Sequence, residues 1–169
     1  MTHKEWLQQL FDGQEQARNG HRDHPHAQFR RKAFQQLQTE EFPGRKEEDW
    51  KYTQVSRILD EGYRDGQAVA LAEADLAPFH FGDLAVTRVV FINGRLNREL
   101  SQLDELPAEV SLQPLAEALE DSGLRTWIEL QTAQPSGTAK NAFLPLNRAF
   151  AEDGLVLTVG RNYRLERPI

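Results

Sequence analysis

Cysteine is absent from this 169-residue sequence, and methionine occurs only once. Without thiols, these residues offer no disulfide, no cysteine nucleophile and no thiolate ligand for a metal ion or cluster. No apolar run reaches the roughly 18 residues of a membrane-spanning helix, so we expect no membrane partner. Residues 1–5 also lack the apolar stretch of a signal peptide, and we therefore expect a cytoplasmic protein.

Positive charge is scarce as well. Lysine and arginine number 20 against 26 acidic residues, which gives a net charge of −6. A negative surface repels a phosphate backbone, so we expect no nucleic-acid partner. Apolar residues make up 39% of the sequence, which is somewhat below the share typical of globular proteins and allows a core of modest size. This length suits one domain or slightly more.

Three histidines, His21, His24 and His26, lie close together in the sequence. Neutral imidazoles suit zinc, copper or nickel, so a metal-dependent enzyme built on these three is one alternative. A linker between helices explains them better, because Pro25 fits a first helical turn and no further ligand or supporting shell is near in sequence. We assign no catalytic residue, no cofactor-binding residue and no metal ligand, and we expect a protein that is not an enzyme.

Residues 2–19 and 25–40 carry two helical patterns. Thr2 and Glu5 have the spacing of a capping box, in which each side chain accepts from the backbone of the other. The apolar residues at helical spacing are Trp6, Leu7, Leu10 and Phe11 in the first segment, and Phe29, Ala33, Phe34 and Leu37 in the second. The two segments therefore predict a helical hairpin with one apolar face that needs a cover.

Residues 43–53 join a Pro-Gly break to an interleaved aromatic pair. Trp50 and Tyr52 are two residues apart, so on an extended segment both rings face the same way, and we expect them to be buried together under the helical hairpin. Thr53 is placed to cap a following helix. Three neighbouring acidic residues are better explained as the start of a helical turn than as an acid–base site: Glu47, Glu48 and Asp49.

Residues 85–100 give the clearest β signal. Asn93 and Gly94 are the pair that a type I′ turn favours, and the turn sets Ile92 opposite Arg95 and Phe91 opposite Leu96. Continued outward, this register pairs Arg88 with Glu99. The first strand is apolar on both faces, so we expect it to be internal in its sheet, with the second nearer an edge.

The remaining segments are less regular. Residues 62–82 read as mostly loop. A short helix is expected to begin at Ser111 or Gln113, with Pro114 in its first turn, and to end at Ser122 and Gly123. Residues 124–130 are ambiguous between helix and strand, residues 134–137 predict a loop, and residues 138–152 predict a last helix. Residues 155–159 form an apolar strand so near the end that we expect the chain to be cut, or its sheet to be continued by another chain.

Four stretches, in this order, resemble the SufB/SufD family of iron–sulfur cluster assembly scaffolds. The first follows the pattern R-x-x-E-x-W-K-Y-T and comprises Arg45, Glu48, Trp50, Lys51, Tyr52 and Thr53. The others are residues 91–96, residues 143–154 with the pattern L-N-x-A-x-x-x-D-G, and residues 165–169. Together they resemble the N-terminal part of the SufD branch, with the SufB branch as the nearest alternative.

The resemblance implies an α+β fold: an N-terminal helical hairpin, then a β-hairpin with short helices, then the first strands leading to a right-handed parallel β-helix that is not present. We accordingly expect residues 1–62, with the W-K-Y-T segment, and residues 63–169 to be two regions. The implied function is that of a non-catalytic scaffold acting with SufB and the ATPase SufC. Iron–sulfur clusters and ATP would be handled by that complex, with no cofactor in this segment. A stand-alone protein-interaction module is the main alternative.

Overall fold

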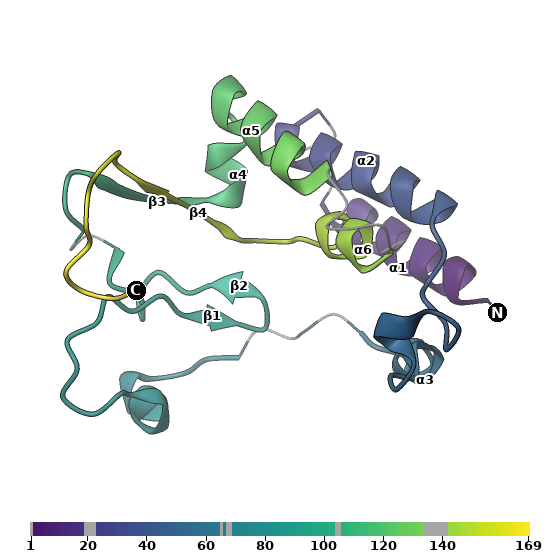
Figure 1. Cartoon of the computed structure of the whole chain (residues 1–169), viewed down its shortest axis with the longest axis horizontal. Helices are drawn as coiled ribbons and strands as arrows, with labels where there is room; N and C mark the ends of the chain where they lie inside the picture. Colours follow the sequence, from purple (N-terminus) through teal and green to yellow (C-terminus); the bar gives the residue numbers. More distant parts are fainter. Residues whose placement is uncertain (1, 19–22, 65, 67–68, 104–105, 134–141) are drawn as a thin grey trace. The chain divides into compact units, whose positions relative to one another are not determined.

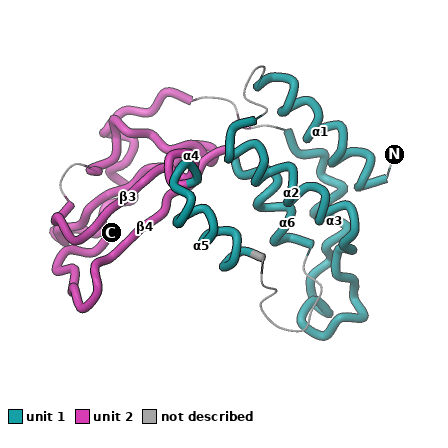
Figure 2. Tube along the Cα trace, turned by 90° about the horizontal axis from the view of Figure 1, so that it is seen from above, with its two compact units in different colours: residues 1–65, 119–151 teal, residues 66–118, 152–169 magenta. Residues whose placement is uncertain are grey.

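The structure, a computed structural model, describes residues 2–18, 23–64, 66, 69–103, 106–133 and 142–169. They form two compact units (Figure 2): unit 1 contains residues 1–65 and 119–151, and unit 2 contains residues 66–118 and 152–169. Unit 1 is helical, and unit 2 carries two small antiparallel sheets. This mixture is the expected α+β class. The β-helix, and the division into regions at residue 62, stay predictions.

Unit 1 is built on the two expected helices. The elements of this unit are α1 (His3–Ala17), α2 (Pro25–Thr39), a 3₁₀ turn (Glu48–Trp50), α3 (Val55–Leu59), α5 (Ser122–Ala133) and α6 (Phe143–Ala149) (Figure 1). The capping box is present, since the Glu5 N–H donates to Thr2 Oγ1 (3.2 Å) and the Thr2 N–H donates to Glu5 Oε2 (2.7 Å). Pro25 occupies the first position of α2, as expected, and the expected helix over residues 138–152 shortens to α6 in the described part.

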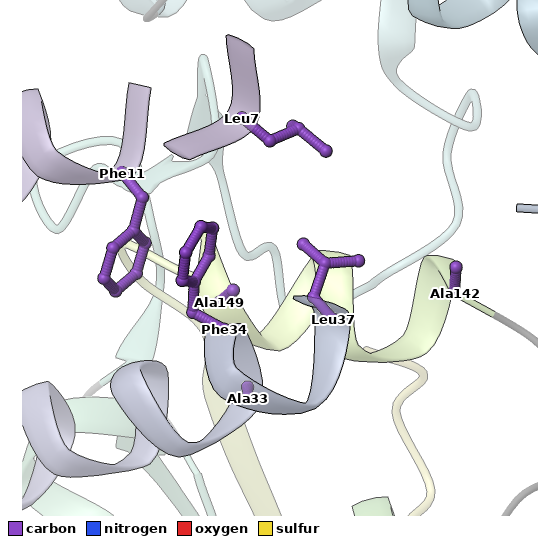
Figure 3. Packing of buried hydrophobic residues seen from close by; sticks show 7 residues of the cluster. All are labelled: Leu7, Phe11, Ala33, Phe34, Leu37, Ala142 and Ala149. Carbon is purple, nitrogen blue, oxygen red and sulfur yellow. The ribbon is translucent and has the colours of Figure 1, made fainter. Parts of the chain in front are cut away.

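The core of unit 1 lies where α1, α2 and α6 meet. The Phe11 and Phe34 rings stack at 4.1 Å between centroids, and Leu7 and Leu37 reach into the same space (Figure 3). Small buried side chains let the helix backbones approach closely: Ala33 on α2, Ala142 just before α6 and Ala149 at its end. The apolar faces that the sequence predicted for the first two helices are therefore the faces that are buried.

The structure corrects the prediction for residues 111–123. Val110–Pro114 is a strand, β3, followed by the short helix α4 (Leu115–Ala118), and Ser122 begins α5 instead of ending a helix. Asp121 explains the new start, because its Oδ1 accepts from the Leu124 N–H (2.8 Å). The ambiguous residues 124–130 are helical, and residues 134–137 lie outside the described part.

Strand β4 (Leu155–Val159) forms where the sequence predicted it, and its partner is β3. The pairing is antiparallel, from Val110 opposite Val159 to Pro114 opposite Leu155. The expectation that a partner must come from beyond the end of the sequence was wrong for this side of the strand. The partner precedes β4, and a pairing between such distant residues leaves no local signal in the sequence.

The Asn-Gly hairpin is confirmed. Asn93 (φ 50°) and Gly94 (φ 80°) both take the left-handed backbone conformation, and β1 (Phe91–Ile92) pairs with β2 (Arg95–Leu96) in the predicted register. The further pairing of Arg88 with Glu99 was wrong. Beyond β2, Asn97 Oδ1 accepts from the Leu100 N–H (2.8 Å), and this side-chain turn ends the strand.

The expectation of an internal first strand was also wrong, because in the described residues β1 pairs only with β2. Residues 62–82 contain more order than the sequence predicted, since Glu73–Phe79 is a 3₁₀ helix that buries Leu76 against Val90 and Leu100. Across the described part of the chain, no helix combines the length and the apolar content needed to cross a bilayer.

Candidate functional site

The W-K-Y-T segment separates its two aromatic rings. Trp50 stacks on Phe143 with 5.2 Å between centroids, whereas Tyr52 is 91% exposed. The predicted burial of both rings under the helical hairpin was therefore wrong, because Trp50 is half-buried against α6 and Tyr52 faces solvent. The cause is the 3₁₀ turn Glu48–Trp50, continued by a hydrogen bond from the Thr53 N–H to the Trp50 oxygen (2.9 Å). With about three residues per turn, residues two apart point in different directions.

The other residues of this segment serve local structure. Lys51 Nζ lies 5.5 Å from the centroid of the Tyr52 ring, an exposed cation–π contact of small energy. Glu47 Oε2 accepts from the Gly44 N–H (2.8 Å), in keeping with the expected role of the acidic residues at the start of a turn. Thr53 does not cap α3, because the N-cap residue is Gln54 and it makes no side-chain cap bond.

Two other stretches of the resemblance meet in unit 2. Asp153 Oδ2 accepts from the Leu96 N–H (2.8 Å), and its Oδ1 accepts from the Gly154 N–H (2.8 Å). One residue earlier on each side, Arg95 pairs with Glu152 (2.6 Å). The aspartate of the L-N-x-A-x-x-x-D-G pattern therefore ties the start of β4 to the β1–β2 hairpin.

The last stretch of the resemblance joins the same unit, because the Thr87 N–H donates to the Pro168 oxygen (2.8 Å). In unit 1, Phe143 begins the third stretch, and Trp50 of the first stretch stacks on it. The first and third stretches therefore contact each other in unit 1, and the second and third in unit 2, whereas the fourth is hydrogen-bonded to Thr87. Packing accounts for Trp50 and Phe143, and hydrogen bonding accounts for Asp153.

The histidines do not converge on one point. His24 caps α2, with its Nδ1 accepting from the His26 N–H (3.3 Å), and its Nε2 lies 2.7 Å from Glu120 Oε1. The His26 Nε2 instead meets the Ala151 oxygen (2.9 Å). In the part of the chain that the structure describes, no three side chains form a group suited to a metal ion, and His21 lies outside that part.

His26 and Arg30 lie one turn apart on α2, and both hold the chain at the end of α6. Arg30 is fully buried and donates from Nε to the Ala149 oxygen (2.9 Å), beside the His26 contact to Ala151. The end of a helix exposes carbonyls that favour such donors. Burial lowers the pKa of His26, which keeps the imidazole neutral, and the hydrogen bond to the Ala151 oxygen opposes this effect.

The Arg30 guanidinium also joins α2 to α1. Its Nη2 donates to Gln14 Oε1 (2.7 Å), its Nη1 contacts Glu15 Oε1 (3.2 Å), and the group lies 5.5 Å from the centroid of the Phe11 ring. No sequence pattern assigned this role to Arg30. An arginine one turn after His26, on the apolar side of α2, is the only signal that the sequence offered.

Several large apolar side chains point away from both cores. In unit 2 these include Phe79 and Phe81, each 76% exposed, and Leu84; we call these three residues the Phe79 patch. In unit 1, Trp127 (54% exposed) and Leu130 (59%) share one face of α5. Such side chains are typical of binding surfaces, and the sequence did not reveal them because exposure depends on the whole fold.

Comparison with known proteins gives two findings. A family model described as the SufBD protein N-terminal region matches residues 1–169. The chain is also similar to an iron–sulfur cluster assembly SufBD family protein of Synechocystis, with 26% identity over 129 residues. The aligned part covers 75% of this chain and 27% of that relative, so the chain spans about a quarter of the length of the curated relative.

Proposed function

This chain belongs to the SufBD family, as an N-terminal region, and on that premise we propose that it is the non-catalytic N-terminal domain of a SufD-like scaffold in iron–sulfur cluster assembly. The observation that carries the proposal is the family match over residues 1–169. The name of the Synechocystis relative places that protein in iron–sulfur cluster assembly, which supports the proposed role in that process.

The proposed role of the domain is architectural. The residues that carry the resemblance pack or hydrogen-bond: Trp50 on Phe143, and Asp153 on Leu96. The Asp153 contact fixes the β1–β2 hairpin to the start of β4 in unit 2, and the Trp50 contact lies in unit 1. In the complete scaffold, this arrangement supports a starting point for the β-helix that the resemblance implies.

The chemistry is proposed to lie with partners. We propose that the complete scaffold acts with SufB and the ATPase SufC, and that clusters are cargo of that complex. Since the 169 residues contain no cysteine, they supply no thiolate for a cluster, which supports a role without a cofactor of its own. The choice of SufD over SufB rests on the early W-K-Y-T segment, the Asn93-Gly94 hairpin and the L-N-x-A helix.

Co-purification tests the proposal. The complete natural polypeptide is co-expressed with SufB and SufC, each with a different tag, and captured through each tag in turn. We expect the complete polypeptide to co-purify with both partners, and residues 1–169 alone to co-purify weakly or not at all. Iron and sulfide are then measured on the purified complexes.

A Trp50→Ala variant of the complete polypeptide serves as the control for architecture. We expect it to unfold at a lower temperature than the wild type, and to bind both partners when the complex is assembled at low temperature. Failure of the well-folded complete polypeptide to bind either partner would contradict the proposal. If it replaces SufB within the complex, in place of joining it, the SufD assignment is wrong while the family membership stands.

A further inference from the structure

The Phe79 patch is unusual because its apolar side chains are large, exposed and close together in the chain. Phe79 and Phe81 are two residues apart, so their Cα atoms are at most about 7.6 Å apart. Gly82 follows with φ 60°, and the Leu84 N–H donates to the Phe81 oxygen (3.3 Å), which returns Leu84 toward the same place. One partner segment can therefore touch all three side chains.

Buried and ionic contacts hold the backbone that carries the patch. Phe79 is the last residue of the 3₁₀ helix Glu73–Phe79, and Leu76 of that helix is buried. Arg88 binds both carboxylate oxygens of Glu73 (2.6 and 2.7 Å) and donates from Nε to the Leu100 oxygen (3.0 Å). A segment that is ordered before binding loses less conformational entropy when a partner docks.

The uncompensated charge along the segment that carries the patch is negative. Residues 65–87 include Asp65, Glu73, Asp75 and Asp83 but neither lysine nor arginine. Glu73 is neutralised by Arg88, whereas Asp75 and Asp83 are exposed and form no ion pair with any described residue. With Glu73 paired to Arg88, the segment that carries the three apolar side chains therefore keeps a net negative charge.

This combination selects the kind of partner. A phosphate backbone and an anionic lipid surface are both repelled by the exposed carboxylates. A segment that carries apolar side chains flanked by lysine or arginine is attracted, and it buries the phenylalanine rings at the same time. Of the macromolecules available to such a surface, a basic amphipathic protein segment is complementary in both respects.

We propose that the Phe79 patch docks a partner protein through a basic amphipathic segment. Its apolar side chains cover Phe79, Phe81 and Leu84, and its basic side chains face Asp75 and Asp83. The inference rests on unit 2 alone. It stands or falls separately from the role in cluster assembly.

Peptide binding tests the proposal on the 169-residue chain. The probe is a fluorescently labelled helical peptide of about five turns, with leucines at core spacing and lysines elsewhere. Its matched control keeps the leucines and replaces every lysine by glutamate. We expect the lysine peptide to bind, with an affinity that falls as salt is added, and the glutamate peptide not to bind.

Two variants locate the binding. Phe79→Ser combined with Phe81→Ser is expected to weaken the lysine peptide at least about 10-fold, as loss of central aromatic anchors does. Asp75→Asn combined with Asp83→Asn is expected to weaken it and to flatten its salt dependence. The matched controls in unit 1 are Trp127→Ser with Leu130→Ser, and Glu41→Gln with Asp49→Asn, and we expect wild-type binding from both.

Other results overturn the proposal. Equal binding by the wild type and the Phe79/Phe81 variant places the peptide elsewhere. Self-association in sedimentation velocity that this variant abolishes identifies a second copy of the chain as the occupant. A much lower unfolding temperature for this variant than for the Trp127/Leu130 control shows that the rings are core residues in solution.

Discussion

The two units place their aromatic side chains differently. In unit 1, Phe11 and Phe34 stack, and Phe150 meets both rings edge-on at 5.9 and 6.3 Å. In unit 2, Phe79 and Phe81 are exposed. The phenylalanines of unit 1 are all buried or half-buried, whereas those of unit 2, Phe79, Phe81 and Phe91, are all exposed.

The contacts that stabilise unit 2 are more polar than those of unit 1. Its buried cluster consists of Leu76, Val90 and Leu100, with the partly buried Ile92 beside it. Hydrogen bonds and ion pairs then fix the segments, such as those from Asp153 to the β1–β2 hairpin and from Arg88 to Glu73. The comparison indicates that unit 1 is stabilised mainly by apolar burial, and unit 2 mainly by specific polar contacts.

The two units can be observed separately. All three tryptophans of the chain lie in unit 1: Trp6, Trp50 and Trp127. Tryptophan fluorescence during urea unfolding therefore reports on unit 1. Hydrogen exchange of backbone amides, such as that of Leu96, reports on unit 2.

The largest expected effect is in the aromatic core. Phe34→Ala removes a buried ring that stacks on Phe11, and we expect it to destabilise unit 1 by about 3–5 kcal/mol. The matched change in unit 2, Phe81→Ala, is expected to stay within about 0.5 kcal/mol because the ring is exposed. Urea unfolding followed by tryptophan fluorescence and amide exchange measures both. Equal losses from the two variants would contradict the comparison.

Arg30 gives the next effect. Arg30→Ala removes the buried donor that binds Gln14, Glu15 and the Ala149 oxygen, and we expect a loss of about 3 kcal/mol, since breaking a buried ion pair is costly. Arg31 binds the same Glu15 through Nε (2.8 Å) but is partly exposed. The control Arg31→Ala is therefore expected to cost less than about 1 kcal/mol in the same urea assay.

In unit 2 the corresponding polar contact is Asp153. Asp153→Ala removes the acceptor for the Leu96 and Gly154 N–H groups, and we expect a loss of about 1–2 kcal/mol. Exchange of the Leu96 amide is expected to accelerate, while the tryptophan transition of unit 1 stays in place. Asp153→Asn keeps an acceptor oxygen and should recover part of the protection. A loss confined to unit 1 would refute the assignment of this contact.

Local signals in the sequence predicted the local structure. The Thr2–Glu5 capping box, Pro25 at the start of α2 and the Asn93-Gly94 turn each concern residues within a few positions of one another. Their geometry follows from short-range hydrogen bonding and φ preferences. The structure therefore confirms these three features.

The errors came from contacts between distant residues. Leu112 and Leu115 have helical spacing, but pairing with β4 draws residues 110–114 into a strand. Tyr52 was expected beside Trp50 on an extended segment, and a tight turn separates them. Of the candidate surfaces, the exposure of Phe79 was not foreseeable, because no periodicity says which apolar residues the rest of the chain leaves uncovered.

Two glycines sharpen the comparison at a smaller scale. Gly13 lies inside α1, and an added Cβ meets nothing within 4 Å, so Gly13→Ala is expected to stabilise unit 1 by about 0.5–1 kcal/mol. Gly94 has φ 80°, so Gly94→Ala is expected to cost about 1–2 kcal/mol and to speed amide exchange at Leu96. The test is whether the two substitutions change the free energy of unfolding in opposite directions, because a stabilising Gly94→Ala would contradict the type I′ turn.

Lowering the pH should destabilise unit 1 before unit 2, and this is the smallest effect that we expect. Burial lowers the pKa of His26 below its ordinary 6.5, so the unfolded chain takes up the proton first. The stability contributed by neutral His26 is complete above pH 6.5 and is lost as the pH falls through the lowered value. In unit 2, the hydrogen bonds from Arg88 lower the pKa of Glu73 from 4.5, so that contribution declines only at pH below 4.5.

Urea midpoints measured by tryptophan fluorescence between pH 7 and pH 5 test this order. The wild type is expected to lose stability over that range, and His26→Gln, which retains a donor for the Ala151 oxygen but does not titrate, is expected to lose less. If both proteins respond equally, another group sets the pH dependence of unit 1. Protonation of His26 at the start of α2 would then not be what weakens the contact between α2 and the end of α6 at low pH.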